Sequence, residues 1–183
     1  MMWIAIRLTF LFELPFQIKI MRQIALLILG FYLVGCYSRQ PEKTGLEGKT
    51  LPSFKLLLID STTYFDTKDI SKGKPVALFL FGPHCPYSKA QMEEIIEDID
   101  MLKDIHFYIF TTWSFPEMKD FYAHYQLNKY PNITMGLDYK NFFGDYFEAQ
   151  GVPYMAIYGR DLKLKKAFIG KIFGKQIKEV AED

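Results

Sequence analysis

The sequence has few cysteines, little excess of either charge, and no internal repeat or low-complexity segment. Its two cysteines, Cys36 and Cys85, allow at most one disulfide. The 22 basic and 21 acidic residues leave a formal net charge of +1. Because the lysines and arginines are scattered, there is no basic patch of the kind that binds nucleic acid. The three histidines are scattered too and give no metal-ligand spacing.

Hydrophobic residues, in contrast, are abundant. They make up 50% of the chain, and aromatic residues alone make up 17%. Such a composition supports a packed core, which disordered chains cannot form. At 183 residues, the chain is expected to fold as one domain with a tail.

The N-terminal region is predicted to be an export signal. Residues 21–36 read MRQIALLILGFYLVGC, in which Arg22 supplies a positive charge and Ile24–Val34 form an apolar run that is short for a membrane span. The closing LVGC, residues 33–36, resembles a bacterial lipobox. That resemblance implies cleavage before Cys36, lipidation of its sulfur and attachment to a membrane. The alternative is an ordinary signal anchor with a chance cysteine.

This interpretation divides the chain into three parts. Residues 1–35 form the signal region; residues 1–20 are a poor signal, so Met21 is an alternative start, with the lipoprotein signal at 21–35. Residues 36–50 are the lipidated cysteine and a polar, flexible tether that contains Pro and Gly. Residues 51–183 form the folded domain, in which Cys85 is the free thiol.

Strand-like and helix-like segments alternate from Leu51 onward. The unbroken apolar run Val76–Phe81 is typical of a strand buried on both faces, and Met92, Ile95 and Leu102 lie at helical spacing. We therefore predict a mixed sheet with helices on both faces, an α/β fold. The predicted strands are 54–60 and 62–65 (a hairpin), 76–81, 106–112, 133–137, 154–159 and 162–168, and the predicted helices are 88–103, 115–125, 141–147 and 175–180.

The stretch FGPHCPYSKAQ, residues 81–91, places Cys85 at the expected start of a helix. Unpaired N–H groups and the positive end of the helix dipole favour a thiolate there, and the thiolate is the nucleophilic form. Pro86 suits the first helical position, where a missing N–H costs nothing. The alternative is a buried cysteine that acts as a small, inert hydrophobic residue.

The same stretch, extended to GKPVALFLFGPHCPYSKAQM (residues 73–92), resembles the active-site strand, loop and helix of the thioredoxin superfamily. Together with the early hairpin, an inserted strand–helix and GVPYMAIYGRDLKLKKAFIG (residues 151–170), it is similar to the redoxin or TlpA-like branch of membrane-tethered thiol–disulfide oxidoreductases. The resemblance implies a thioredoxin-like fold over residues 51–180. It also implies that Pro153, after Val152, is a cis-proline beside Cys85 in a groove for extended substrates.

Ser88 departs from that family's pattern. A second cysteine at this position resolves the mixed disulfide with the substrate, and a hydroxyl cannot do so. The site is therefore predicted to be a single-cysteine CPYS site, with Cys85, Ser88 and Pro153 as its catalytic set. His84, Pro86, Tyr87 and Val152 are assigned to the substrate groove. His84 is either a cation that supports the Cys85 thiolate or a loop residue facing solvent.

Two related families fit less well. CPYS resembles a monothiol glutaredoxin site, but the distance from Cys85 to Pro153 is longer than in that family and its glutathione-holding Gly pair is missing. A peroxiredoxin would carry Pro and Thr or Ser where this chain has Leu78 and Gly82.

Three functional hypotheses follow. The first is a lipid-anchored, single-cysteine thiol–disulfide oxidoreductase of the bacterial cell envelope, without a cofactor or metal. Its partners would be protein thiols or disulfides and an external thiol reductant. The second is a non-catalytic module that binds extended peptides or an envelope partner, with aromatic residues of FTTWSFPEM (110–118) and YKNFFGDYF (139–147) as contact surface. The third is a structural domain of an envelope assembly.

Overall fold

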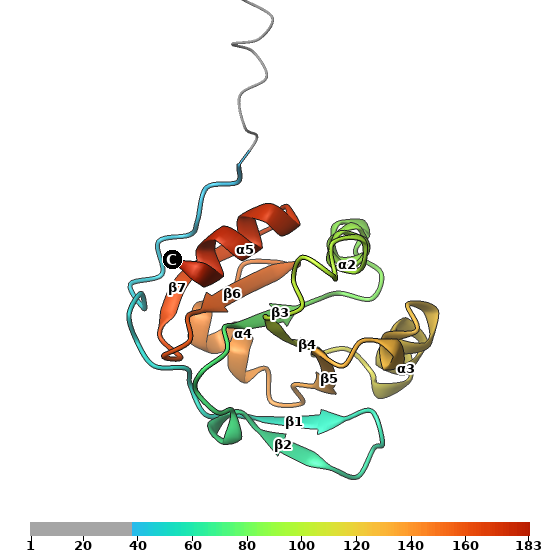
Figure 1. Cartoon of the computed structure of the whole chain (residues 1–183). Coiled ribbons are helices and arrows are strands. Elements are labelled where there is room, and N and C mark those ends of the chain that lie inside the picture. The colour runs from blue at the N-terminus through green and yellow to red at the C-terminus, as the bar shows by residue number, and fades with distance from the viewer. Residues whose placement is uncertain (1–37) are drawn as a thin grey trace, which may run out of the picture. The chain divides into compact units, whose positions relative to one another are not determined.

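The computed structural model describes residues 38–183, and their fold is a seven-stranded mixed sheet covered by helices (Figure 1). The strands are β1 (Lys55–Leu58), β2 (Tyr64–Asp66), β3 (Val76–Leu80), β4 (His106–Thr111), β5 (Ile133–Leu137), β6 (Tyr154–Tyr158) and β7 (Leu164–Ile169). The helices are α2 (Pro86–Glu97), α3 (Phe115–His124), α4 (Phe142–Phe147) and α5 (Gly174–Glu182), with 3-10 turns η1 (Thr67–Asp69) and η2 (Leu127–Lys129). The predicted α/β fold is confirmed.

The strand order is β2-β1-β5-β4-β3-β6-β7. Strands β3, β4 and β5 are parallel, whereas β6 and β7 continue the sheet antiparallel from β3, and β1 joins β5 antiparallel at the other side. The early hairpin is present as β1 and β2, with Leu56 opposite Phe65. The predicted strand and helix between α3 and β6 are present as β5 and α4.

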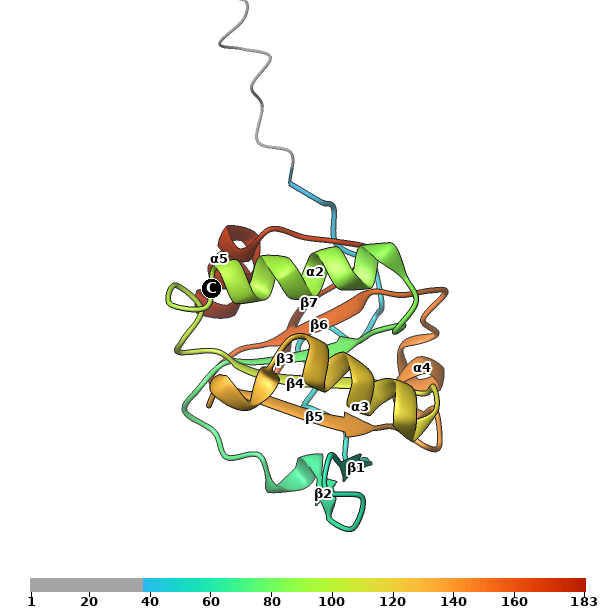
Figure 2. The same cartoon turned by 90° about the vertical axis from the view of Figure 1, so that its right-hand side faces the viewer.

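Helices lie on both faces of the sheet (Figures 1 and 2). The strand side chains alternate between the two cores, as the twofold period of a strand requires. In β3, Ala77 and Phe79 enter the core under α2, α3 and α5, while Val76, Leu78 and Leu80 enter the core on the α4 side. All five are buried, which confirms the expectation from their unbroken apolar run.

Helix α2 is anchored to the loop between β7 and α5. The buried amide of Gln91 donates to the Ile172 carbonyl oxygen at 3.1 Å and accepts from the Ile172 N–H at 2.7 Å. Glu94 forms an ion pair with Lys171 and accepts from the Gly174 N–H at 3.1 Å. These contacts fix the position of the helix that begins directly after Cys85.

Two predicted boundaries of this helix were wrong. It begins at Pro86 rather than Ser88, and it ends at Glu97 rather than residue 103. The last turn holds no basic residue, and the acidic Glu97, Asp98 and Asp100 oppose the negative end of the helix dipole. The chain continues as turns, in which Leu102 is still buried. The helical spacing of Leu102 therefore predicted its burial correctly but not its secondary structure.

The described part of the predicted tether packs against the folded domain. Backbone hydrogen bonds join Glu42 to Ala167, Gly48 to Leu164 and Leu51 to Leu162 along the outer edge of β7. Arg39 exchanges two further hydrogen bonds with the Gln176 side chain on α5. The folded unit therefore includes residues ahead of the predicted boundary at Leu51, and the expectation of a flexible linker is corrected for this stretch.

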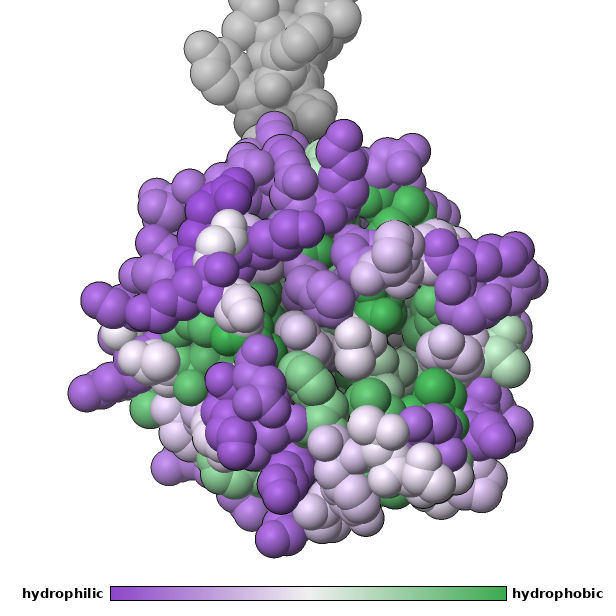
Figure 3. Space-filling model, turned by 60° about the horizontal axis from the view of Figure 1, so that its bottom comes forward, coloured by the Kyte–Doolittle hydropathy of each residue, from purple (hydrophilic) through white to green (hydrophobic). Residues whose placement is uncertain are grey.

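Figure 3 shows the face at the lower end of Figure 1, where β1 and β2 lie. Hydrophobic residues there occupy hollows between hydrophilic ones, and they form no single continuous apolar patch in this view. No helix within residues 38–183 combines the length and the apolar character needed to cross a membrane. The predicted signal region and Cys36 lie outside the described residues.

Candidate functional site

Cys85 is the N-cap residue of α2. Its backbone is extended (φ −76°, ψ 119°), and Pro86 occupies the first turn. The Cys85 N–H donates to the Gly82 carbonyl at 3.0 Å, and its carbonyl accepts from the Lys89 N–H at 3.1 Å. The thiol therefore lies at the N-terminus of a helix, the position that the sequence predicted for it. The side chain is partly exposed, so the sulfur can be reached from the surface.

The loop before β6 lies against this thiol. Cys85 Sγ lies 3.4 Å from the Val152 carbonyl oxygen, to which it donates. The Val152–Pro153 peptide bond is cis, as expected, and the buried Pro153 carbonyl accepts from the Gly170 N–H at 2.7 Å. The structure thus brings Cys85, Val152 and Pro153 together from positions 67 residues apart.

Gly82 is required for this close approach. A β-carbon at this position would lie 2.9 Å from Val152 Cγ2, 3.3 Å from Cys85 Cβ and 3.4 Å from the Trp113 ring. Trp113 is 40% exposed and follows β4, whose carboxyl end lies beside that of the parallel strand β3. Gly82 and Trp113 were not among the predicted site residues. Their positions after two neighbouring parallel strands are the signal that indicates them.

Ser88 faces the interior of the protein. It is fully buried, and its hydroxyl oxygen accepts from the Gly82 N–H at 3.1 Å. The hydroxyl thus binds the loop that precedes Cys85 and satisfies a backbone donor that would otherwise be unpaired. Of the other predicted groove residues, Tyr87 is strongly exposed at 66% and Pro86 is exposed. The roles assigned to these residues stay predictions.

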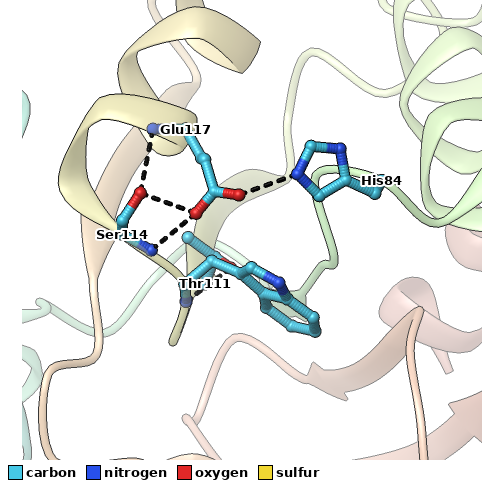
Figure 4. Close-up of polar contacts among 5 residues, drawn as sticks. His84, Thr111, Ser114 and Glu117 are labelled. Carbon is cyan, nitrogen blue, oxygen red and sulfur yellow. Dashed lines mark hydrogen bonds and ion pairs between the residues drawn. The ribbon is translucent and has the colours of Figure 1, made fainter.

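His84 is exposed, yet it has a specific partner (Figure 4). Its Nε2 lies 2.7 Å from Glu117 Oε1 on α3. Glu117 Oε2 accepts from the Ser114 N–H at 3.0 Å and from the Ser114 hydroxyl at 2.6 Å, and Ser114 Oγ accepts from the Glu117 N–H in return. This reciprocal capping box begins α3. Sequence reasoning missed Glu117, although the Ser-x-x-Glu spacing is its signature.

The Glu117 carboxyl is held in its ionised form. Hydrogen bonds from the Ser114 hydroxyl, then from His84 and the Ser114 N–H, lower the pKa of Glu117. The ion pair with His84 therefore has one partner that stays charged across the physiological range. It joins the first turn of α3 to the loop that carries Cys85.

Two hollows adjoin the site. One of about 300 Å³ is lined by the loop at His84 and by α2 and α3, and another of about 430 Å³ reaches Val152. Within residues 38–183, no three His, Cys, Asp or Glu side chains lie together as a metal ion would require. The arrangement supplies one partly exposed thiol, a carbonyl beside it and open space on the surface.

No protein-family model matches the chain. Solved structures share its fold at low identity. A secreted disulfide oxidoreductase of Mycobacterium tuberculosis superposes with a TM-score of 0.58 and 17% identity, covering 70% of this chain and 93% of that one. The thioredoxin domain of a Bacteroides vulgatus thiol–disulfide oxidoreductase gives a TM-score of 0.58 and 13% identity, covering 73% of this chain and 93% of that one.

A nearer relative in sequence is an uncharacterized protein of Haemophilus influenzae. It is 35% identical over 117 residues, which cover 61% of this chain and 74% of the relative. The solved structures establish the thioredoxin-like fold. The sequence match to the Haemophilus influenzae protein establishes a family relationship. The chain belongs to the same family as the Haemophilus influenzae protein, and it has the thioredoxin-like fold.

Proposed function

We propose that this protein catalyses thiol–disulfide exchange in the bacterial cell envelope through the single nucleophilic thiol of Cys85. The observation that carries the proposal is the placement of that thiol. It lies at the N-terminus of α2, partly exposed, with Sγ 3.4 Å from the carbonyl that precedes a cis-proline. The neighbours in structure that are thiol–disulfide oxidoreductases support the proposal by analogy of fold.

The exchange has two steps. In the first, the Cys85 thiolate attacks one sulfur of a partner disulfide; a Cys85–partner disulfide forms, and the other partner sulfur leaves as a thiolate. In the second, an external thiolate attacks the partner's sulfur in that mixed disulfide and releases the Cys85 thiolate. The partner leaves joined to the external thiol, so one disulfide is consumed, one is formed, and no net electrons are transferred.

The external thiol is needed because of Ser88. A hydroxyl cannot displace a thiolate from a disulfide. The Ser88 hydroxyl oxygen instead accepts a hydrogen bond from the Gly82 N–H. The mixed disulfide with Cys85 should therefore persist until a thiolate of the partner or of a second molecule attacks it. A glutathionylated protein is itself a mixed disulfide, so the Cys85 thiolate attacks one of its two sulfurs and releases either glutathione or the protein as the thiolate. A sulfenylated protein cysteine would form the mixed disulfide with loss of water.

The test compares Ser88→Cys with the parent protein. Positions three apart at the start of a helix lie close enough for the two thiols to bridge. Ser88→Cys should form an internal disulfide under mild oxidation and should gain insulin-reductase activity. The matched control is Ser53→Cys, which makes the same substitution at an exposed serine that donates to Asp66. This variant should gain neither property.

The parent protein should instead accumulate mixed disulfides with envelope proteins, and these should vanish in Cys85→Ala. If the parent forms no adduct through Cys85 while Ser88→Cys still folds, exchange is not its function. In that case the alternative, a non-catalytic binding module with the same groove, would replace the proposal. Two exposed aromatic residues favour that alternative: Tyr87, two positions after Cys85, and Trp113, whose ring lies against Gly82.

We further propose that the protein is anchored in a membrane by lipid on Cys36, with residues 1–35 removed. The support is the LVGC motif at residues 33–36 in the sequence. Mass spectrometry of detergent-extracted protein should identify an acylated N-terminal Cys36. Recovery of an intact, unmodified segment 21–35 would contradict the anchor without affecting the proposal for Cys85.

A further inference from the structure

An exposed tryptophan lies beside the Cys85 thiol. A β-carbon added to Gly82 would lie 3.3 Å from Cys85 Cβ and 3.4 Å from the tip of the Trp113 ring. The ring tip is therefore no further from Cys85 Cβ than the sum of these two distances. Trp113 is 40% exposed, so part of its surface also faces solvent. The ring can therefore touch both the site and an arriving molecule.

The backbone on both sides of this ring is fixed. The Trp113 N–H donates to the hydroxyl of the buried Thr111 at 3.2 Å. The next residue, Ser114, is the N-cap of α3 and forms the capping box with Glu117 (Figure 4). A side chain that is already held in place loses little conformational freedom when a partner binds. Trp113 is therefore suited to be a contact residue.

The geometry of a disulfide determines what reaches the ring. In a mixed disulfide, the β-carbons of the two cysteines lie roughly 3.5–4.5 Å apart and their α-carbons roughly 4.4–6.8 Å apart. Any partner joined to Cys85 Sγ must therefore bring its cysteine, and the residues next to it, into the space around Cys85 Cβ. The added β-carbon on Gly82 would also lie 2.9 Å from Val152 Cγ2. An indole ring and a valine methyl group thus border the space that the partner enters.

We propose that Trp113 is a specificity-determining residue that favours partners with an apolar side chain next to the reacting cysteine. The inference rests on the proposed function, because it names the class of partner for the same thiol. Its chemistry follows from the indole ring and the methyl group beside Cys85, which are stabilised when they bury apolar rather than polar surface. Tryptophan is also a residue type whose truncation in the centre of an interface often costs more than about fivefold in affinity.

The experiment measures how fast Cys85 reacts with three short peptides. All proteins carry Cys36→Ser, so that Cys85 is their only cysteine. Each peptide has one cysteine, present as a disulfide with 2-thiopyridine, and either leucine, lysine or serine on both sides of it. The Cys85 thiolate attacks the peptide sulfur and forms the Cys85–peptide disulfide, and the thiopyridine leaves as a thiolate whose absorbance is recorded. Below saturation, the parent should react roughly fivefold faster with the leucine peptide than with the serine peptide.

Three variants identify the source of this preference. Trp113→Ala should remove it while leaving the rate with the serine peptide nearly unchanged, and Trp113→Phe, which keeps an aromatic ring, should retain most of it. The matched control is Tyr64→Ala, which removes a side chain that is 56% exposed on β2 and should keep the parent's ratio. A ratio of two rates does not change when the amount of folded protein or the reactivity of the thiol falls. A merely structural role of the ring would therefore leave the ratio as it is.

The outcomes separate this inference from the proposed function. Equal rates with the leucine and serine peptides in the parent, or a preference that survives in Trp113→Ala, would overturn the role of Trp113. A lysine peptide that reacts fastest, and only when Trp113 is present, would assign the ring to cationic side chains and overturn the apolar class. In each of these cases Cys85 still exchanges disulfides. If neither the peptides nor the small disulfide 2,2′-dithiodipyridine reacts with Cys85, the proposed function fails, and this inference fails with it.

Discussion

Removing the Ser88 hydroxyl should destabilise the domain through the loop that precedes Cys85. In Ser88→Ala, the buried Gly82 N–H loses its 3.1 Å acceptor. The space left by one oxygen atom is too small to admit a water that could replace it. A buried donor without a partner costs about 1–3 kcal/mol in the free energy of unfolding. For a domain of this size, each kcal/mol lowers Tm by about 2–4 °C.

The assay is urea denaturation followed by far-UV circular dichroism under reducing conditions, so that no disulfide contributes. Ser53→Ala is the matched control, since it removes a hydroxyl that donates to Asp66 at the exposed surface. That change should alter the free energy of unfolding by less than about 0.5 kcal/mol. If Ser88→Ala costs no more than Ser53→Ala, the Ser88 hydroxyl does not hold the loop, and its burial has another cause.

Two further predictions concern the elements around the site. Gln91→Leu should cost about 2–5 kcal/mol in urea denaturation, because it leaves both the N–H and the carbonyl of Ile172 without their partner; a cost below 1 kcal/mol would show that this anchor of α2 is dispensable. Burial, and then Lys74, lower the pKa of His106, so the unfolded chain binds this proton more readily than the folded one. Stability should therefore rise with pH from the lowered native pKa up to about 6.5, and His106→Gln should flatten the rise in Tm measured between pH 5 and 7.

The fold could be predicted because its signals are local. The apolar run of β3 and the spacing of Met92 and Ile95 in α2 each identify an element without knowledge of its neighbours. The ends of elements were less predictable. Leu102 continued the helical spacing of α2, but the helix ends at Glu97, where acidic residues oppose the negative end of its dipole. The Leu102 side chain reaches the core from a turn.

The residues of the candidate site could be predicted where a single sequence motif contains them. They could not be predicted where segments distant in the sequence meet in the fold. Cys85 and the cis bond at Pro153 followed from motifs, and the structure places them together. Glu117 and Trp113 were missed because neither is unusual by itself. Only the parallel pairing of β3 with β4 brings the start of α3 to the loop at His84, and that pairing is a long-range property of the sheet.

The stretch from Glu42 to Leu51 also bears on self-association of the protein. A sheet that ends in an unpaired strand can recruit a second chain, and this pairing is a common start of aggregation. Here β7 is capped at its outer edge by the backbone of residues 42–51, and the opposite edge is β2, which is only three residues long. The segment therefore covers the edge of β7 and blocks pairing with another chain there. A shortened protein that begins at Leu51 would expose this edge of β7 for self-association.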